Sequence, residues 1–121
     1  MAISYTCSLV TTLAGETPIV LSPGVQTIAK SAKGVYSDYK TITTSPLTLS
    51  STTLKGQLTT AGLCFVRNCD STNFVSVGSA TGAYNQKVLA GESYVFRLSG
   101  SDCFLAADTA SVDIQWVVLE N

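Results

Sequence analysis

The feature that most constrains this chain is the alternation of apolar and polar residues over short runs. The clearest run spans residues 112–119. The residues on its apolar face are Val112, Ile114, Trp116 and Val118. Successive side chains of a strand point to opposite faces of a sheet, so this period of two predicts a strand with one buried face. No window of about a dozen residues has the spacing of an amphipathic helix, so we expect a chain built from strands.

Similar runs recur along the chain and are separated by Gly, Pro, Ser, Asp and Asn, which are typical of turns. In the first half, strands are predicted at 3–13, 17–28, 35–44 and within 46–58. The run 35–44 is predicted to be an edge strand, and a single helical turn is the alternative for 26–33. In the second half, strands are predicted at 62–69, 73–78, 86–89, 93–98, 103–107 and 112–119. The polar turn at 70–72 predicts that 62–69 and 73–78 pair as a hairpin.

About eight to ten short strands at intervals of roughly 8–12 residues are typical of an antiparallel sandwich or barrel. A chain of 121 residues has the usual size of one domain and can bury a core without a metal or a disulfide. We see no internal repeat and no low-complexity linker. We therefore expect an all-β fold, a single antiparallel β-sandwich or jelly-roll-like barrel, as one domain over residues 1–121.

Charged residues make up only 12% of the chain, against about 25% in an average protein, and the net charge is -1. We therefore expect part of the exterior to be covered by partners, or to be a neutral sheet face rich in Ser and Thr. Lys and Arg form no cluster that could follow a nucleic-acid backbone. The apolar runs are far shorter than the ~20 residues of a spanning helix, and residues 1–5 lack the pattern of a signal peptide. These observations predict no nucleic-acid partner, no membrane partner and synthesis in a cytosol.

The chain contains no histidine. This removes the commonest general base near neutral pH, most nucleophile–base pairs and most catalytic zinc sites. The carboxylates fall mostly at turns, where they cap the backbone, and they lack the spacing of a calcium loop. A spatial pair of carboxylates, as in glycosidases, is left open by the sequence. We expect a protein that is not an enzyme and that holds no metal and no cofactor.

The four cysteines are Cys7, Cys64, Cys69 and Cys103. One hypothesis is that they are reduced thiols that pack as small apolar residues. The other is that they form disulfides, within or between subunits, after the protein leaves the reducing cytosol. Cys64 and Cys69 would face opposite sides of one regular strand, which argues against a direct bridge between them unless the strand has already turned.

Three further side chains are candidates for an interface. Arg67 and Arg97 lie in strand-like runs beside Phe65 and Phe96. Each could form an interface ion pair or stack its guanidinium group, or could simply reach solvent from a strand. Trp116 could fill the core or anchor a partner.

Several motifs in the second half carry a resemblance. They are the segments Phe65-Val66-Arg67-Asn68, 72–78 (TNFVSVG), 89–98 (LAGESYVFRL) and 107–114 (ADTASVDI), and the opening residues 1–5 are also similar. Together they resemble small virion proteins of tailed bacteriophages. In physical terms, Gly78 and Gly91 allow tight backbone geometry and Glu92 is suited to cap its turn.

The resemblance implies a virion structural protein, synthesised in the host cytoplasm and located in the virion. We favour a capsid decoration or cement subunit, or a neck-associated subunit, that forms a homo-oligomer and contacts major capsid, neck or tail subunits. The alternative is a receptor- or glycan-binding module of a tail or fibre tip, with Tyr36, Tyr39 and Tyr84 as candidate aromatic contacts. The cysteines depart from the pattern and suggest a member with added cross-links.

Overall fold

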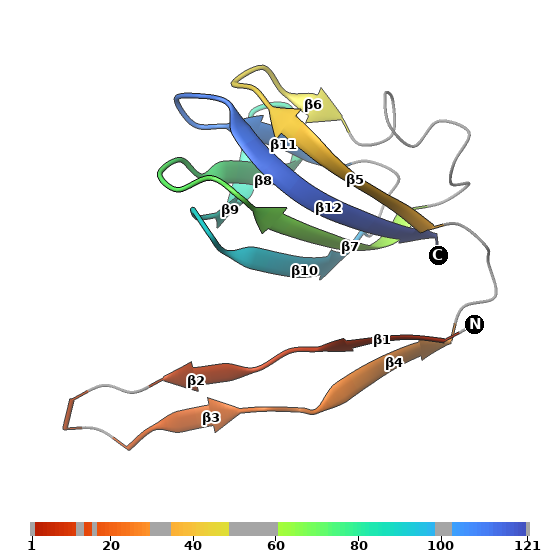
Figure 1. Ribbon diagram of the computed structural model, residues 1–121, viewed down its shortest axis with the longest axis vertical. Coiled ribbons are helices and arrows are strands. Elements are labelled where there is room, and N and C mark those ends of the chain that lie inside the picture. Colours follow the sequence, from red (N-terminus) through yellow and green to blue (C-terminus); the bar gives the residue numbers. More distant parts are fainter. Residues whose placement is uncertain are drawn as a thin grey trace. The chain divides into compact units, whose positions relative to one another are not determined.

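The computed structural model describes residues 2–11, 14–15, 17–29, 35–48, 61–98 and 103–120. All regular structure in these residues is β-strand, and twelve strands are formed (Figure 1). The all-β prediction is therefore confirmed, with more strands than the sequence pattern indicated.

The chain divides into two compact units, Met1–Ser31 and Ala32–Asn121. Every residue of the buried core cluster belongs to the second unit. The single domain expected over 1–121 stays a prediction.

The first unit is a long two-stranded antiparallel ribbon, drawn in red and orange in Figure 1. β1 (Ala2–Thr6) pairs with β4 (Val25–Ala29), and β2 (Leu9–Thr11) pairs with β3 (Ile19–Leu21). The helical turn offered as an alternative for 26–33 is wrong for residues 26–29, because these pair with β1 across the ribbon; residues 30–33 lie outside the described residues. Here the pairing with a neighbouring strand determines the backbone conformation, and the local helical preference of the residues does not.

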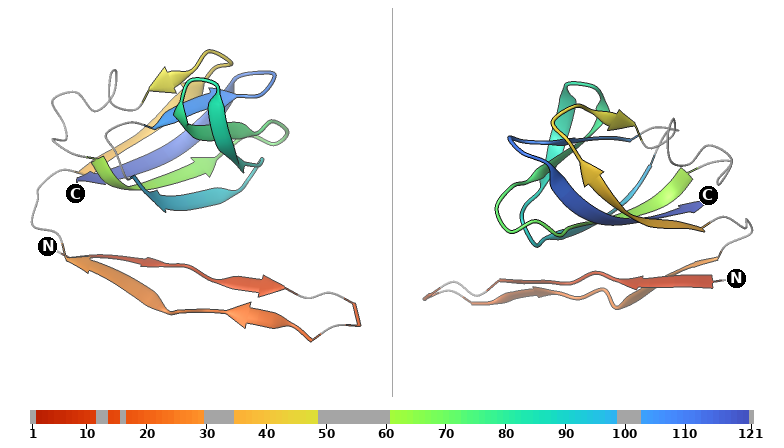
Figure 2. Two further views of the ribbon diagram at one scale, coloured as in Figure 1. Left: turned by 180° about the vertical axis from the view of Figure 1, so that it is seen from behind. Right: turned by 45° about the horizontal axis from the view of Figure 1, so that its top comes forward.

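The second unit contains two four-stranded antiparallel sheets that face each other (Figures 1 and 2). The strands of the first sheet, in spatial order, are β10 (Ser93–Arg97), β7 (Ala61–Asn68), β12 (Val112–Glu120) and β5 (Val35–Ile42). Those of the second sheet are β6 (Leu47–Thr48), β11 (Phe104–Ala107), β8 (Val75–Ala80) and β9 (Ala83–Val88). The sandwich prediction is confirmed, and β5 is the edge strand expected at 35–44. The described strands do not close into a barrel.

The predicted hairpin between 62–69 and 73–78 is wrong. β7 pairs with β10 and β12, whereas β8 pairs with β9 and β11, so the two strands belong to different sheets. The turn between them forms as expected: the Oδ1 atom of Asp70 accepts hydrogen bonds from the backbone N–H groups of Thr72 and Asn73, both at 2.7 Å. This turn carries the chain from one sheet to the other.

The core lies between the two sheets of the second unit. The apolar face of β12 consists of Val112, Ile114, Trp116 and Val118, each 0% exposed, as the alternation predicted. The facing sheet contributes buried residues such as Val75, Val77 and Leu105. The second unit is therefore a packed scaffold on which surface sites are held.

Candidate functional site

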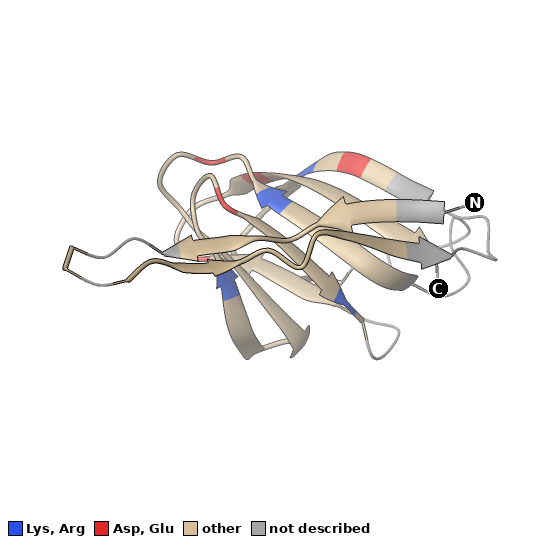
Figure 3. Cartoon of the chain, turned by 90° about the horizontal axis from the view of Figure 1, so that it is seen from below, with Lys and Arg blue, Asp and Glu red and all other residues tan. Residues whose placement is uncertain are grey.

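Most of the large apolar side chains that are exposed among the described residues lie on the ribbon. Its large exposed apolar residues are Leu9, Val10, Ile19, Val20, Leu21 and Val25, each between 54% and 64% exposed. We call these six side chains the ribbon surface. The described residues of the ribbon include no Asp, Glu, Lys or Arg. The charged residues that the structure describes, coloured in Figure 3, all belong to the second unit.

The ribbon surface occupies both faces of the ribbon. Leu9 is paired with Leu21, and the next pair along the strands is Val10 with Val20. Adjacent positions point to opposite faces, so an apolar pair lies on each side. An isolated two-stranded ribbon is only marginally stable in water, and the described residues of its edges include none of the charged residues that commonly block pairing with other strands. This arrangement suits a segment that other surfaces cover on both sides.

The two candidate arginines are exposed on the outer face of the β10-β7-β12-β5 sheet. Arg67 is opposite Ser93, and Arg97 is opposite Leu63. The two residues therefore lie four positions apart along the β7–β10 pair, which is about 13 Å. The structure does not bring them together, and each presents its charge separately.

Trp116 is 0% exposed and belongs to the core cluster of the second unit. A side chain without exposed surface does not contact a partner, so the core role is the one that the structure shows. The interface role suggested for Trp116 has no support in this geometry.

None of the four cysteines forms a disulfide in the structure. Cys64 and Cys103 are buried in the core cluster, whereas Cys7 and Cys69 are exposed. Burial, with a smaller contribution from the nearby Cys103, raises the pKa of Cys64 to about 12. A thiol with such a pKa stays protonated and is a poor nucleophile near neutral pH. Cross-linking stays a prediction, with Cys7 and Cys69 as the thiols that a second subunit can reach.

Asn68 is a structurally important residue whose role the sequence analysis missed. It is 0% exposed, and its Nδ2 atom donates hydrogen bonds to the carbonyl oxygens of Asn73 and Val88 at 2.9 and 3.0 Å. Its Oδ1 atom accepts a hydrogen bond from the backbone N–H of Asp70 at 2.8 Å. The signal for this role was present, because Asn68 continues the buried face of β7 as a polar residue next to a turn. These contacts hold a crossover between sheets and offer no reactive group.

The turn between β9 and β10 forms as its residues indicated. Gly91 has a φ of 79°, in the region that glycine adopts without strain. The Oε2 atom of Glu92 accepts a hydrogen bond from the backbone N–H of Leu89 at 2.9 Å. The capping role expected of Glu92 is therefore confirmed.

The tyrosines proposed for a glycan-binding face do not form one surface. Tyr39 is 71% exposed on the edge strand β5, whereas Tyr84 is half-buried on β9 in the other sheet. Tyr36 also lies in β5, and its side chain is outside the described residues. The aromatic side chains that do lie together are Tyr94 and Phe96 on β10, whose ring centroids are 4.9 Å apart.

In the part of the chain that the structure describes, His, Cys, Asp and Glu side chains form no group of three or more that could hold a metal ion. The same part of the chain includes no helix with the length and apolar character needed to span a membrane.

Comparison of the chain with known protein families, with characterised proteins and with solved structures gives no match. The resemblance to small virion proteins therefore rests on the sequence motifs alone, and the function must be argued from the surfaces described above.

Proposed function

We propose that this protein is a virion structural subunit, a capsid decoration or cement protein or a neck-associated protein, that stabilises the particle through contacts with neighbouring subunits. The observation that supports the proposal is the ribbon surface: six large apolar side chains, more than half exposed, on a segment whose described residues carry no charge. Exposed apolar patches of this kind mark surfaces that other proteins cover.

The free energy gained by covering the ribbon surface is of the same order as the cost of association. Full burial of one Val, Leu or Ile side chain stabilises by about 1.5–3 kcal/mol, so burying the exposed share of these six gives about 5–10 kcal/mol. Association costs of the order of 4–15 kcal/mol oppose this gain. A single ribbon therefore gives at most modest binding. A symmetric assembly, in which each subunit both covers a ribbon and has its own ribbon covered, repeats the gain at every contact.

The charge pattern indicates how such contacts form. Because the described ribbon residues are uncharged, they meet a partner through shape and apolar burial and not through ion pairs. Salt screens interactions between charges and leaves apolar burial in place. Assembly through the ribbon surface is therefore expected to change little as the salt concentration rises.

The test is to place charges on one face of the ribbon in the full-length protein. In the double variant Val10→Glu and Val20→Glu, two facing carboxylates replace an apolar pair. We expect self-association, followed by light scattering, and binding to phage heads stripped of the protein, followed by co-sedimentation, to weaken at least about 100-fold. The matched control is Ser8→Glu with Ser22→Glu, which adds the same charge at exposed polar positions of the ribbon and should weaken binding less than about threefold.

Two results would overturn the proposal. One is a parent protein that remains a monomer and binds no particle component. The other is a protein that binds host cells but not stripped heads, which would favour the receptor-binding alternative. The position of the gene beside capsid, neck or fibre genes would separate the decoration role from the neck role.

A further inference from the structure

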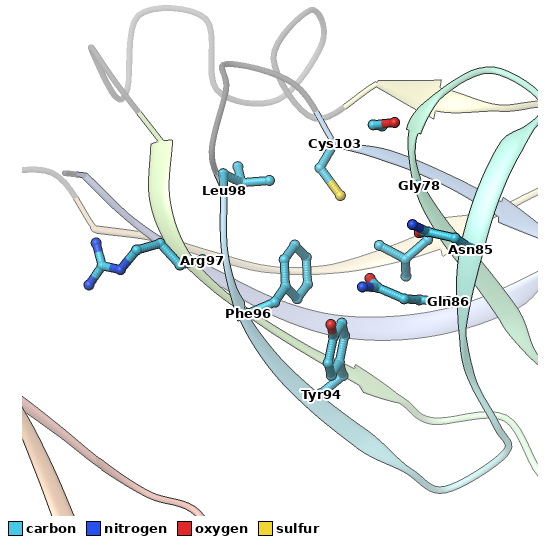
Figure 4. Close-up of a pocket in the computed structure, with 10 residues that line it drawn as sticks. Gly78, Asn85, Gln86, Tyr94, Phe96, Arg97, Leu98 and Cys103 are labelled. Atoms are coloured by element: carbon cyan, nitrogen blue, oxygen red, sulfur yellow. The ribbon is translucent and has the colours of Figure 1, made fainter.

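A small cavity lies at the open side of the sandwich, between β8 and β9 of one sheet and the edge strand β10 of the other (Figure 4). Its volume is about 230 Å³. The lining side chains that matter here are Tyr94, Phe96, Ser79, Asn85 and Gln86. None of them is used by the contacts proposed for the ribbon, so this cavity is independent of the proposed function.

One wall of the cavity is aromatic. The rings of Tyr94 and Phe96 are stacked, with an interplanar angle of 20°, and both point from β10 into the cavity (Figure 4). Among the described residues of the lining, Arg97 is the only charged one, and its guanidinium group points away from the cavity (Figure 4). The described lining therefore presents an apolar aromatic wall and directs no charged side chain into the cavity.

The opposite wall is shaped by two irregularities in the pairing of β8 with β9. Val77 is opposite Gln86 but Gly78 is opposite Tyr84, which leaves Asn85 as an extra residue of β9. The next pair is Ala80 with Ala83, which leaves Ser79 as an extra residue of β8. Bulges of this kind redirect side chains and are frequent beside binding sites. Both extra residues line the cavity.

Gly78 makes this backbone arrangement possible. A Cβ atom at position 78 would overlap the carbonyl oxygen of Ala83 and approach the backbone of Tyr84. Only a residue without a side chain allows the two strands to come this close. The glycine singled out in the sequence therefore maintains the geometry of the cavity wall.

The polar side chains of this wall have hydrogen-bonding groups to spare. Ser79, Asn85 and Gln86 are exposed, and within the described part of the chain their side chains make no hydrogen bond. Each amide group offers two donors and an acceptor oxygen, and the hydroxyl offers one donor and two lone pairs. These groups are therefore free to bind a ligand that carries several hydroxyl or amide groups.

We propose that this cavity binds a single neutral sugar ring. The apolar C–H face of the ring would lie against Tyr94 and Phe96, and its hydroxyl groups would hydrogen-bond to Asn85, Gln86 and Ser79. The described lining residues point no charge into the cavity, which disfavours phosphate and carboxylate ligands, and three free polar side chains disfavour a purely apolar one. The volume is below the roughly 300–1,000 Å³ of pockets for drug-sized ligands, which suits one ring or the terminal residue of a glycan.

The test is an NMR titration of the full-length protein with neutral hexoses and N-acetylhexosamines, and with a uronic acid as the charged comparison. We expect millimolar affinity for at least one neutral sugar, with shifts of the Asn85 and Gln86 side-chain amides and saturation transfer to the rings of Tyr94 and Phe96. Asn85→Ala and Gln86→Ala should each weaken binding about tenfold. Gln115→Ala, which removes a similar amide from β12, is the matched control and should bind as the parent does.

A second titration shows whether the natural ligand is a free monosaccharide or the end of a glycan chain. It uses a polysaccharide that ends in the sugar found to bind. Tighter binding of the polysaccharide than of the free sugar indicates a glycan chain, and equal binding indicates a free monosaccharide. The proposal is overturned if no sugar shifts the Asn85 or Gln86 resonances, if the alanine variants bind as the parent does, or if the uronic acid binds as well as the neutral sugars. The ribbon variant Val10→Glu with Val20→Glu should keep sugar binding, so that failure of one proposal leaves the other testable.

Discussion

The buried thiol of Cys64 makes the stability of the core depend on pH. Burial, with a smaller contribution from Cys103, raises the pKa of this thiol from its ordinary value of 9.0 to about 12. Above about pH 9 the unfolded chain releases this proton whereas the folded chain keeps it, so the free energy of unfolding falls as pH rises toward about 12. Below about pH 9 both states keep the proton, and Cys64 contributes no pH dependence.

The substitution Cys64→Ala should remove this alkaline loss of stability. Near neutral pH we expect the variant to be about 1 kcal/mol less stable than the parent, because it leaves a small cavity. As pH rises above about 9 this difference should close and then reverse, since the parent loses about 1.4 kcal/mol per pH unit, up to about 4 kcal/mol across the whole range. Urea unfolding between about pH 7 and about pH 11 measures the effect. Cys69→Ala removes an exposed thiol and should follow the parent, whereas parallel curves for Cys64→Ala and the parent would contradict the argument.

Residue-level alternation predicted the buried face of β12. Trp116 and its neighbours on β12 alternate as the sequence indicated, and in β7 the residues Cys64, Val66 and Asn68 are buried. The position of Asn68 beside a turn was a signal for its contacts with Asp70 and Asn73, but the pattern could not reveal its bond to Val88, because only the fold brings β9 near. The free amides around the cavity were missed for the same reason, since Asn85 and Gln86 look like ordinary polar strand residues.

At the scale of elements, the β8–β9 pair depends on the close approach at Gly78. We expect Gly78→Ala to lower the free energy of unfolding by about 2–3 kcal/mol, because a Cβ atom there overlaps the backbone of Ala83 and the strands must separate. Ser76→Ala lies two residues earlier on the same strand and serves as the control, with an expected change within about 0.5 kcal/mol. Urea unfolding compares the two variants, and equal stability would mean that β8 and β9 separate at no cost.

Strand positions could be predicted, but strand partners could not. The run 62–69 and the run 73–78 each form a strand near the expected bounds, yet they join different sheets. A short polar turn has the same sequence whether it closes a hairpin or crosses between sheets, because the choice depends on distant strands. Here β7 takes β10 and β12 as neighbours, which lie 25 or more residues later in the chain. The two bulges could not be predicted from the sequence either, since they arise from the register of β8 against β9.

At the scale of the whole molecule, the two units are held by different forces. The second unit has a buried core between two sheets, whereas the first is a two-stranded ribbon with exposed apolar side chains. Backbone hydrogen bonds in a marginal ribbon open without unfolding of the rest of the chain, whereas those of central strands open only when the core unfolds. The ribbon is therefore the part whose stability depends on what covers it.

Hydrogen exchange followed by mass spectrometry tests this division. In the isolated subunit we expect the paired amides of β1–β4 to exchange at least about 100-fold faster than those of β7 and β12, because opening of the ribbon breaks no core contact. In the assembled state the ribbon amides should become protected while those of β12 change little, since assembly buries the ribbon and leaves the core as it was. If β1–β4 exchange as slowly as β12 in the isolated subunit, the chain unfolds as one cooperative domain and the ribbon needs no partner. Slow exchange of β12 in both states serves as the internal reference for an intact core.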